Sequence, residues 1–194
     1  MQIGIPLTLV VSYLIGSVPF GVIFSKTMKG KDPRAAGSKN IGFTNVLRVV
    51  GAGPAILTLC GDVGKGALAA YIGTYYESPG VGEVSALFAI LGHCYPIFLR
   101  FHGGKAVATS FGALAVLYPS EGVITFALWV ITVLWSRYVS LGALVAFATL
   151  PLIMIWSHPH WDTILFSLAI AILVYLRHRE NISRLVSKAE GKSF

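Results

Sequence analysis

The chain has 194 residues, of which 55% are hydrophobic and only 12% are charged, and its mean hydropathy is +0.75. Soluble domains carry about 25% charged residues, so this composition excludes an ordinary soluble protein and indicates one embedded in lipid. The formal net charge of +7 does not indicate a nucleic-acid partner, because the basic residues lie in short gaps between apolar stretches, where membrane topology accounts for them.

Seven apolar stretches follow one another along the chain, and a membrane-spanning helix needs about 20 such residues. They cover residues 3–25, 51–76, 83–99, 104–118, 121–135, 138–157 and 161–176. The sequence therefore predicts an all-α integral membrane protein with seven transmembrane helices in a single membrane-embedded domain, 1–194. The stretches 104–118 and 121–135 are short, and a re-entrant pair is the alternative there.

The Lys and Arg residues are distributed asymmetrically between the gaps. Of the 15, Lys65 lies within the second stretch and Lys105 lies where the third gap meets the fourth stretch, and the others lie in the first, third and fifth gaps and in the C-terminal tail. Cytoplasmic loops carry an excess of Lys and Arg in multi-pass membrane proteins. We therefore expect the N-terminus outside, the C-terminus in the cytoplasm, and a site formed by the short cytoplasmic loops.

The longest cytoplasmic gap, residues 26–50, contains a turn rich in Gly, Ser and Asn that continues into a helix. Backbone N–H groups of such a turn, together with the helix dipole, form a site for anions. A polar connecting loop with a helix cap is the alternative, since Gly-rich loops are weak signals. The candidate anion-binding residues are Gly37, Ser38, Asn40, Gly42, Thr44, Asn45 and Arg48.

Two further clusters lie in or beside the next spans. Gly103 and Gly104 precede Lys105 at the start of the fourth stretch, with Thr109 one turn later. A lone interfacial lysine would be the simpler interpretation, but two glycine–cation clusters on one membrane face favour a shared anionic ligand. Within the second stretch, Asp62 and Lys65 are three residues apart, which predicts a structural ion pair, with ligand contact as the alternative.

The last cluster follows the seventh stretch. His178 and Asn181 share a helix face, so they are candidates for proton transfer or phosphate binding; His93, at the end of the third stretch, is a candidate for the site or for packing. No carboxylate cluster that could hold a divalent cation is evident. We therefore expect no metal and no cofactor, and a site that holds anions with cations and amides.

These clusters, in this order, resemble a known family over nearly the whole chain. The shared motifs are Gly16-Ser-Val-Pro-Phe-Gly21, Gly37-Ser-Lys-Asn-Ile-Gly-Phe-Thr-Asn45 with Arg48, Gly61-Asp62, Lys65-Gly66, His93 with Pro96, Gly103-Gly104-Lys105 with Thr109, Ser140, and His178, Glu180-Asn181 and Arg184-Leu185. The chain is similar to the bacterial acyl-phosphate:glycerol-3-phosphate acyltransferases of the PlsY family.

Two positions depart from that family's pattern. Lys39 and Ala106 stand where the family more often has Gly. An alanine fits at position 106 if its φ is negative, so we expect altered loop geometry there rather than lost activity.

The resemblance implies transfer of a fatty acyl group from acyl phosphate to the 1-hydroxyl of glycerol 3-phosphate, giving lysophosphatidic acid and phosphate, in the bacterial cytoplasmic (inner) membrane. Both substrates and the membrane lipids are the expected partners. The sequence does not determine the oligomeric state, and a monomer is one of the alternatives. The resemblance places Ser38, Arg48, Lys105, His178 and Asn181 at the reaction centre, Gly37, Asn40, Gly42, Thr44, Asn45, Gly103, Gly104, Thr109 and Ser140 in substrate binding, and Asp62, Lys65 and Glu180 in structural roles.

The mechanism leaves two choices open. The general base is either His178 or a phosphate oxygen of the donor, and a covalent Ser38 intermediate is unnecessary because acyl phosphate is already activated. A small transporter or channel for an anionic metabolite is the alternative from another class, since intramembrane Asp62 and Lys65 would suit one. Against a transporter, the polar residues gather on one side of the membrane only.

Overall fold

A computed structural model describes residues 4–192, and residues 1–3 and 193–194 lie outside the described part. The first residue of the predicted stretch 3–25 and both ends of the predicted domain 1–194 are therefore outside it. Between them the chain is built from helices and connecting loops. The α-helices are α1 (Ile5–Ser17), α2 (Phe20–Lys29), α3 (Phe43–Val49), α4 (Ala52–Tyr76), α5 (Pro79–Cys94), α6 (Val107–Leu117), α7 (Pro119–Ser136), α8 (Val139–Ser157), α9 (Trp161–Arg177) and α10 (Arg179–Val186), and the 3₁₀ turns are η1 (Pro33–Ala35) and η2 (Ile97–Leu99).

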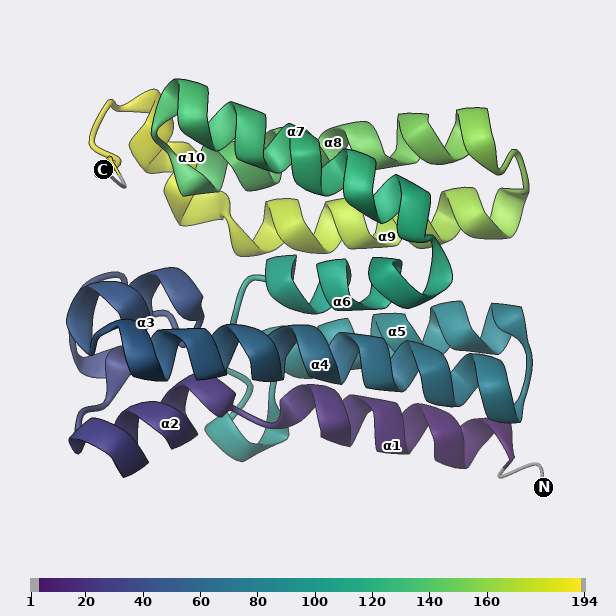
Figure 1. Cartoon of the computed structure of the whole chain (residues 1–194), viewed down its shortest axis with the longest axis horizontal. Helices are drawn as coiled ribbons and strands as arrows, with labels where there is room; N and C mark the ends of the chain where they lie inside the picture. Colours follow the sequence, from purple (N-terminus) through teal and green to yellow (C-terminus); the bar gives the residue numbers. More distant parts are fainter. Residues whose placement is uncertain (1–3, 193–194) are drawn as a thin grey trace.

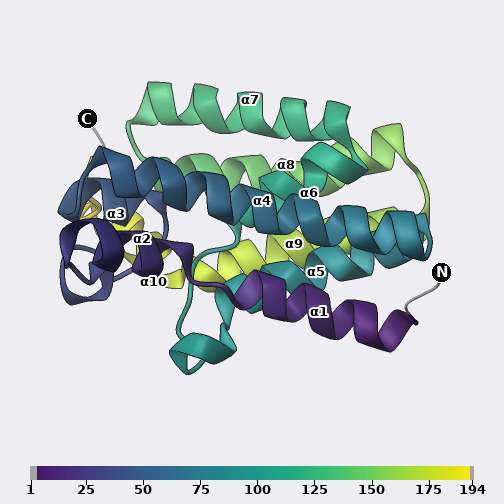
Figure 2. The same cartoon turned by 60° about the horizontal axis from the view of Figure 1, so that its bottom comes forward.

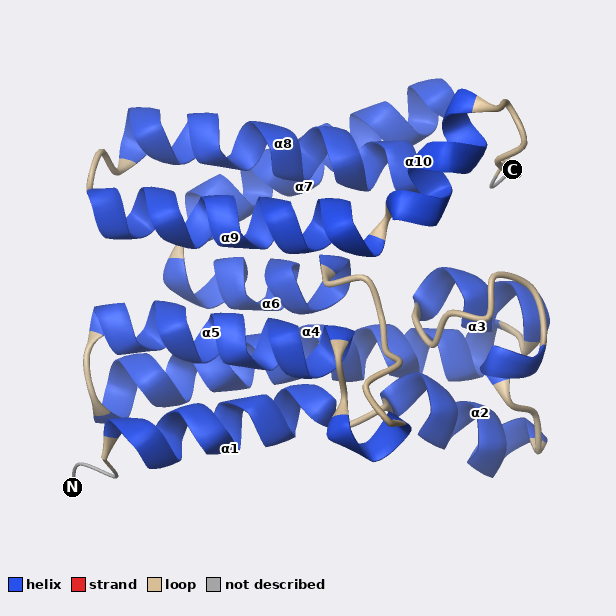
Figure 3. Cartoon of the chain, turned by 180° about the vertical axis from the view of Figure 1, so that it is seen from behind, coloured by secondary structure: helices blue, strands red, loops and turns tan. Residues whose placement is uncertain are grey.

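The long helices lie side by side in an elongated bundle (Figure 1). Helix α5 packs against α1 and α4, α8 packs against α7 and α9, and α6 lies between the two groups in contact with α4, α5 and α7. Figure 3 shows the same arrangement from behind, with the described chain helical apart from its connecting loops. The short helices α2, α3 and α10 gather at one end, together with the described C-terminus, while α1 begins at the other end.

The first predicted stretch is not one continuous helix. It is broken between α1 and α2 at Val18 and Pro19, because proline lacks an N–H and forces the preceding residue out of the helical region; Val18 has φ −60° and ψ 117°. The freed carbonyl of Val18 accepts a hydrogen bond from Lys65 Nζ at 3.2 Å. A buried cation from α4 therefore provides a hydrogen-bond donor for the carbonyl that the helix break exposes.

Glycines allow several helices to approach closely. A Cβ at Gly16 of α1 would lie 2.1 Å from the Ala89 carbonyl oxygen of α5, and one at Gly66 of α4 would lie 2.0 Å from the Thr109 carbonyl oxygen of α6. Small residues at helix contacts let backbones pack against each other in lipid, where no hydrophobic force drives helices together. These crossings hold α6 against α4 beside the loops that follow α5.

The helices support a multi-pass membrane protein. Five helical segments within residues 4–192 are long and apolar enough to cross a membrane, or six if the bent pair α9 and α10 counts as one span. Helix α6 has 11 residues, a rise of about 16 Å, which is shorter than a bilayer core of about 30 Å. The count of seven spans and the orientation of the termini remain predictions.

The exposed surface of the bundle fits a lipid environment. Large apolar side chains are exposed along the lengths of the helices, and Trp135, Trp156 and Trp161, all near helix ends, are 85%, 85% and 76% exposed. Tryptophan favours the interface between lipid and water. Figure 2 shows the turn η2 projecting from the bundle near the break between α1 and α2; Ile97, Phe98 and Phe101 in and beside this turn are also exposed.

Candidate active site

A cavity of about 600 Å³ lies at the end of the bundle where α3 and α10 gather. One part of its wall is polar and comes mainly from α3 and the loop before it, the loop before α6 and the segment from α9 to the tail, with single polar residues from α4, α5 and α8. The other part is apolar and comes mainly from α4, α6, α7 and α8. The polar lining residues are Ser38, Asn40, Thr44, Asn45, Arg48, Asp62, His93, Lys105, Ser140, His178, Asn181, Arg184 and Glu190, with Gly37 and Gly42 among them.

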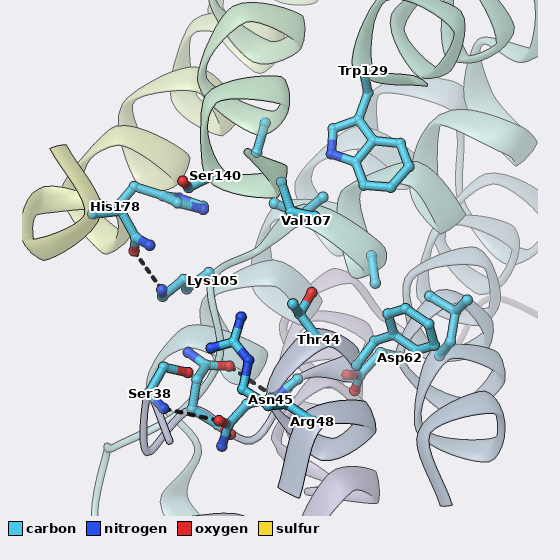
Figure 4. A pocket seen from close by; sticks show the side chains of 18 of the residues that line it. Ser38, Thr44, Asn45, Arg48, Asp62, Lys105, Val107, Trp129, Ser140 and His178 are labelled. Atoms are coloured by element: carbon cyan, nitrogen blue, oxygen red, sulfur yellow. Dashed lines mark hydrogen bonds between the residues drawn. The ribbon is translucent and has the colours of Figure 1, made fainter. Parts of the chain in front are cut away.

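The loop from residue 37 to 42 is braced from within by Asn45, which is 2% exposed. Its Oδ1 accepts a hydrogen bond from the Ser38 N–H at 2.9 Å, and its Nδ2 donates to the carbonyls of Pro33 and Asn40 at 2.8 Å each. Both polar atoms of the Asn45 amide are thus engaged in the loop. Asn45 holds the predicted anion loop in shape, while Ser38, Thr44 and Arg48 lie beside the cavity (Figure 4).

Lys39 and Ala106, which stand where the family more often has Gly, both have a left-handed backbone conformation. Lys39 has φ +56° and Ala106 has φ +73°, a region that residues with a Cβ adopt only at a cost of about 1–2 kcal/mol. The condition under which an alanine would fit without strain, a negative φ at position 106, is therefore not met, and Ala106 is strained. Ala106 is fully buried and caps the start of α6.

Lys105 is presented by a loop that Arg177 holds in place. The guanidinium of Arg177 donates to the carbonyls of Gly103 and Gly104 at 3.0 Å each, and it lies 5.0 Å from the ring centre of Tyr95. Gly104 also has no room for a side chain, since a Cβ would lie 1.9 Å from His93 Nε2. The two glycines therefore set the path of the loop that carries Lys105, and neither lines the cavity.

The ammonium group of Lys105 reaches the cavity and donates a hydrogen bond to Asn181 Oδ1 (Figure 4). Burial lowers the pKa of Lys105 to about 8, and the nearby positive charge of Arg184 adds to this effect, while the carboxylate of Glu190 opposes it. A lysine with such a pKa is mostly charged at neutral pH and loses its charge a little above it. Lys105 is thus a cation poised to titrate beside an anion site.

The predicted ion pair between Asp62 and Lys65 is present, with 2.7 Å between Oδ1 and Nζ and side chains 3% and 2% exposed. His93 Nδ1 from α5 lies 3.5 Å from the same Asp62 oxygen. This buried cluster joins α4, α5 and the break after α1, as a structural role for the pair predicts. Asp62 also lines the cavity, whereas Lys65 does not.

His178 lies between α9 and α10, where the chain bends by 62°. Its Nδ1 lies 2.8 Å from the carbonyl of Val174, and a carbonyl can only accept, so a neutral His178 carries its proton on Nδ1. The second ring nitrogen, Nε2, then has a free lone pair. Figure 4 shows His178 and Ser140 on one side of Lys105, with Arg48 and Ser38 on the other.

The apolar wall begins beside these polar groups. Trp129, Phe126 and Phe111 stack or meet edge to face, and Leu59, Val63, Val107 and Ala143 complete the wall. A second cavity of about 260 Å³ shares Phe111 and Phe126 with the first and reaches Pro119 at the start of α7. Apolar surface therefore extends from the cavity along α6 and α7, into the neighbouring second cavity lined by the same two aromatic side chains.

The structure brings together most of the candidate residues but not all of them. Thr109 is fully buried at the contact of α6 with Gly66 and does not line the cavity. Glu180, with a side chain 77% exposed, lies 4.0 Å from Arg184. Sequence reasoning missed Arg177 and Glu190. The run of basic residues that begins with the last residue of α9 was a signal for the first, and no sequence signal placed the second.

The whole chain is similar to proteins with a known activity. A family model described as "Glycerol-3-phosphate acyltransferase" matches residues 6–188. A glycerol-3-phosphate acyltransferase of Carboxydothermus hydrogenoformans is 44% identical over 186 residues, covering 96% of this chain and 95% of that relative. Glycerol-3-phosphate acyltransferase 2 of Moorella thermoacetica is 43% identical, over 96% of both chains.

Solved structures give the same result. The chain superposes with a TM-score of 0.92 on a crystal structure of PlsY (YgiH), an integral membrane glycerol 3-phosphate acyltransferase in its glycerol 3-phosphate form, at 35% identity over 97% of this chain and 94% of the other. The lysophosphatidic acid form of PlsY gives a TM-score of 0.90 at 33% identity over the same shares. These matches identify an enzyme and not a transporter: the chain belongs to the glycerol-3-phosphate acyltransferase (PlsY) family.

Proposed function

We propose that this enzyme takes its acyl group from acyl phosphate and transfers it to the 1-hydroxyl of glycerol 3-phosphate. The observation that supports this most is the single cavity with a cationic end and an apolar end. Both substrates carry a phosphate, for which Arg48, Lys105 and the amides of the Ser38 loop are suitable partners. The acyl chain suits the wall formed by Phe111 and Trp129, where apolar surface is buried.

The proposed step forms one ester bond and breaks one anhydride bond. The 1-hydroxyl oxygen attacks the acyl carbonyl carbon, the bond from that carbon to the phosphate oxygen breaks, and phosphate leaves with the bonding electrons. The hydroxyl proton passes either to a phosphate oxygen of the donor or to His178 Nε2. Lys105 and Arg48 offset the negative charge that develops on the departing phosphate and on the carbonyl oxygen.

The remaining candidates have supporting roles in this proposal. Ser140 and Asn181 bind the acceptor from the α8 and α10 side, and Gly37, Asn40, Gly42, Thr44 and Asn45 hold and form the donor loop. Gly103 and Gly104 act by placing Lys105. Thr109 has no part in substrate binding in this proposal, because its buried position at the α4–α6 contact leaves it outside the cavity.

We also propose that the protein is one domain of the bacterial inner membrane, with the cavity at the cytoplasmic face. The cationic gaps and the cavity lie at the same end of the bundle, as expected for loops retained on the cytoplasmic side. Glycerol 3-phosphate is charged and water-soluble, so a cytoplasmic opening would give it direct access.

Purified protein supplied with glycerol 3-phosphate and either acyl phosphate or acyl-CoA tests the donor. We expect lysophosphatidic acid with acyl phosphate only, and a release of one phosphate per product. Efficient turnover with acyl-CoA alone would refute the proposal. For the base, His178→Gln keeps measurable turnover if the donor phosphate takes the proton, and lowers kcat by roughly 10²–10⁴-fold if His178 does.

A further inference from the structure

The C-terminal tail returns to the cavity after α10 ends. Lys188 has φ +57°, and the N–H groups of Ala189 and Glu190 donate to the carbonyl of Arg184 at 2.8 and 3.1 Å. This left-handed turn caps the helix and reverses the chain. As a result Glu190, 13 residues beyond the end of α9, lies against the polar wall with a side chain only 12% exposed.

The Glu190 carboxylate makes three hydrogen bonds there. Oε1 accepts from Ser140 Oγ at 2.8 Å and from Asn181 Nδ2 at 2.6 Å, and Oε2 accepts from Arg184 Nε at 2.7 Å. Burial alone would raise the pKa of Glu190, but these three donors outweigh it and hold the pKa below its ordinary value. Glu190 is therefore ionised at neutral pH and ties α8, α10 and the tail together.

This arrangement determines how the Asn181 amide faces. An ionised carboxylate can only accept hydrogen bonds, so it engages the NH₂ group of Asn181. The amide oxygen is then turned toward Lys105, whose ammonium group donates to it. The charges of Lys105 and Glu190 are thus linked through one amide, with Arg184 on the far side of the carboxylate.

We propose that Glu190 is a positioning residue for glycerol 3-phosphate, because it orients Asn181 and Arg184 and, through the Asn181 amide, the ammonium group of Lys105. The negative charge of Glu190 also favours the charged form of Lys105. The proposal rests on the proposed function, in which Asn181 binds the acceptor and Lys105 binds a substrate phosphate. Glu190 need not touch the substrate, because it acts through Asn181 and Lys105. The other charged groups around Lys105 are Arg184, Glu180 and Arg177, with Arg48 and His178 lining the same cavity.

The test is the pH profile of kcat/KM for glycerol 3-phosphate, from pH 6.5 to 10, in wild type, Glu190→Gln and a control, Glu180→Gln. The control removes the same charge from a side chain that is 77% exposed and is therefore screened by water. In wild type, kcat/KM should fall at high pH as Lys105 loses its charge. We expect Glu190→Gln to raise KM about tenfold with a smaller change in kcat, and to move this high-pH decline in kcat/KM about 0.5 pH units or more toward lower pH. Glu180→Gln should move it less.

A second variant separates this role from general packing. Glu190→Asp keeps the charge, so the high-pH decline should stay within about 0.2 pH units of wild type even if the shorter side chain reduces stability. An unshifted decline in Glu190→Gln would overturn the proposal. So would a lower KM in that variant, which would mean that the carboxylate competes with the anionic substrate. Absence of any high-pH decline in wild type would instead refute the proposed role of Lys105.

Discussion

The titration of Lys105 gives the sharpest prediction for the reaction itself. Its pKa is about 8 because burial disfavours the charged form, with Arg184 adding to the shift, and only the charged form can bind a phosphate strongly. Raising the pH removes that charge. The value of kcat/KM for glycerol 3-phosphate should therefore be level near pH 7 and fall about tenfold per pH unit well above pH 8.

The substitution Lys105→Arg tests the assignment. A guanidinium stays charged throughout this range, so the variant should lose the high-pH decline, although its plateau should be lower because the contact with Asn181 changes. Lys105→Ala should reduce kcat/KM about tenfold to a hundredfold or more, as expected when a charge-assisted contact worth about 1.5–3 kcal/mol is lost.

The assay is the initial rate of lysophosphatidic acid formation at low glycerol 3-phosphate in detergent micelles, with the hydrolysis of acyl phosphate measured at each pH without enzyme. At saturating glycerol 3-phosphate the decline should move to higher pH, since a bound phosphate stabilises the ammonium form. A decline that persists at the same pH in Lys105→Arg would refute the reasoning, because another group would then be titrating.

Three further predictions concern the loops and the topology. Gly104→Ala should lower kcat/KM at least tenfold, because its Cβ would meet the His93 ring at 1.9 Å. Gly64→Ala is the control and should keep full activity, because a Cβ there has no neighbouring atom within 4 Å. Equal effects of the two substitutions would contradict the role of the loop before Lys105. Lys39→Gly should raise the free energy of unfolding by about 0.5–1 kcal/mol, because glycine adopts a φ of +56° without strain. If thermal or denaturant unfolding shows that the variant is less stable than wild type, Lys39 is not strained. In a background without Cys60 and Cys94, a cysteine at Gly80 should react with a membrane-impermeant thiol reagent in intact cells and one at Lys31 should not; labelling at Lys31 would invert the proposed orientation.

Much of this protein follows from its sequence alone. The apolar stretches predict an all-helical membrane protein because partition into lipid depends on local composition, which is read directly from about 20 successive residues. The glycine–cation clusters predict anion sites, since the geometry of a short turn is also local. The order of these clusters along the chain predicts membership of the PlsY family, and the similarity to solved PlsY structures confirms it. The Asp62–Lys65 pair was predictable for the same reason, because a helix places such residues on one face.

Other features depend on which surfaces meet after the helices pack, and only the tertiary structure decided them. Asn45 braces its own loop through contacts with Pro33 and Ser38, while Thr109, placed beside Lys105 by sequence, is turned into the close contact with Gly66. Ala106 keeps a left-handed φ because the loop around it is held by Arg177 from another helix. Glu190 reaches Ser140, 50 residues away, because a turn after α10 reverses the tail; such a contact depends on long-range packing, which no local pattern in the sequence reports.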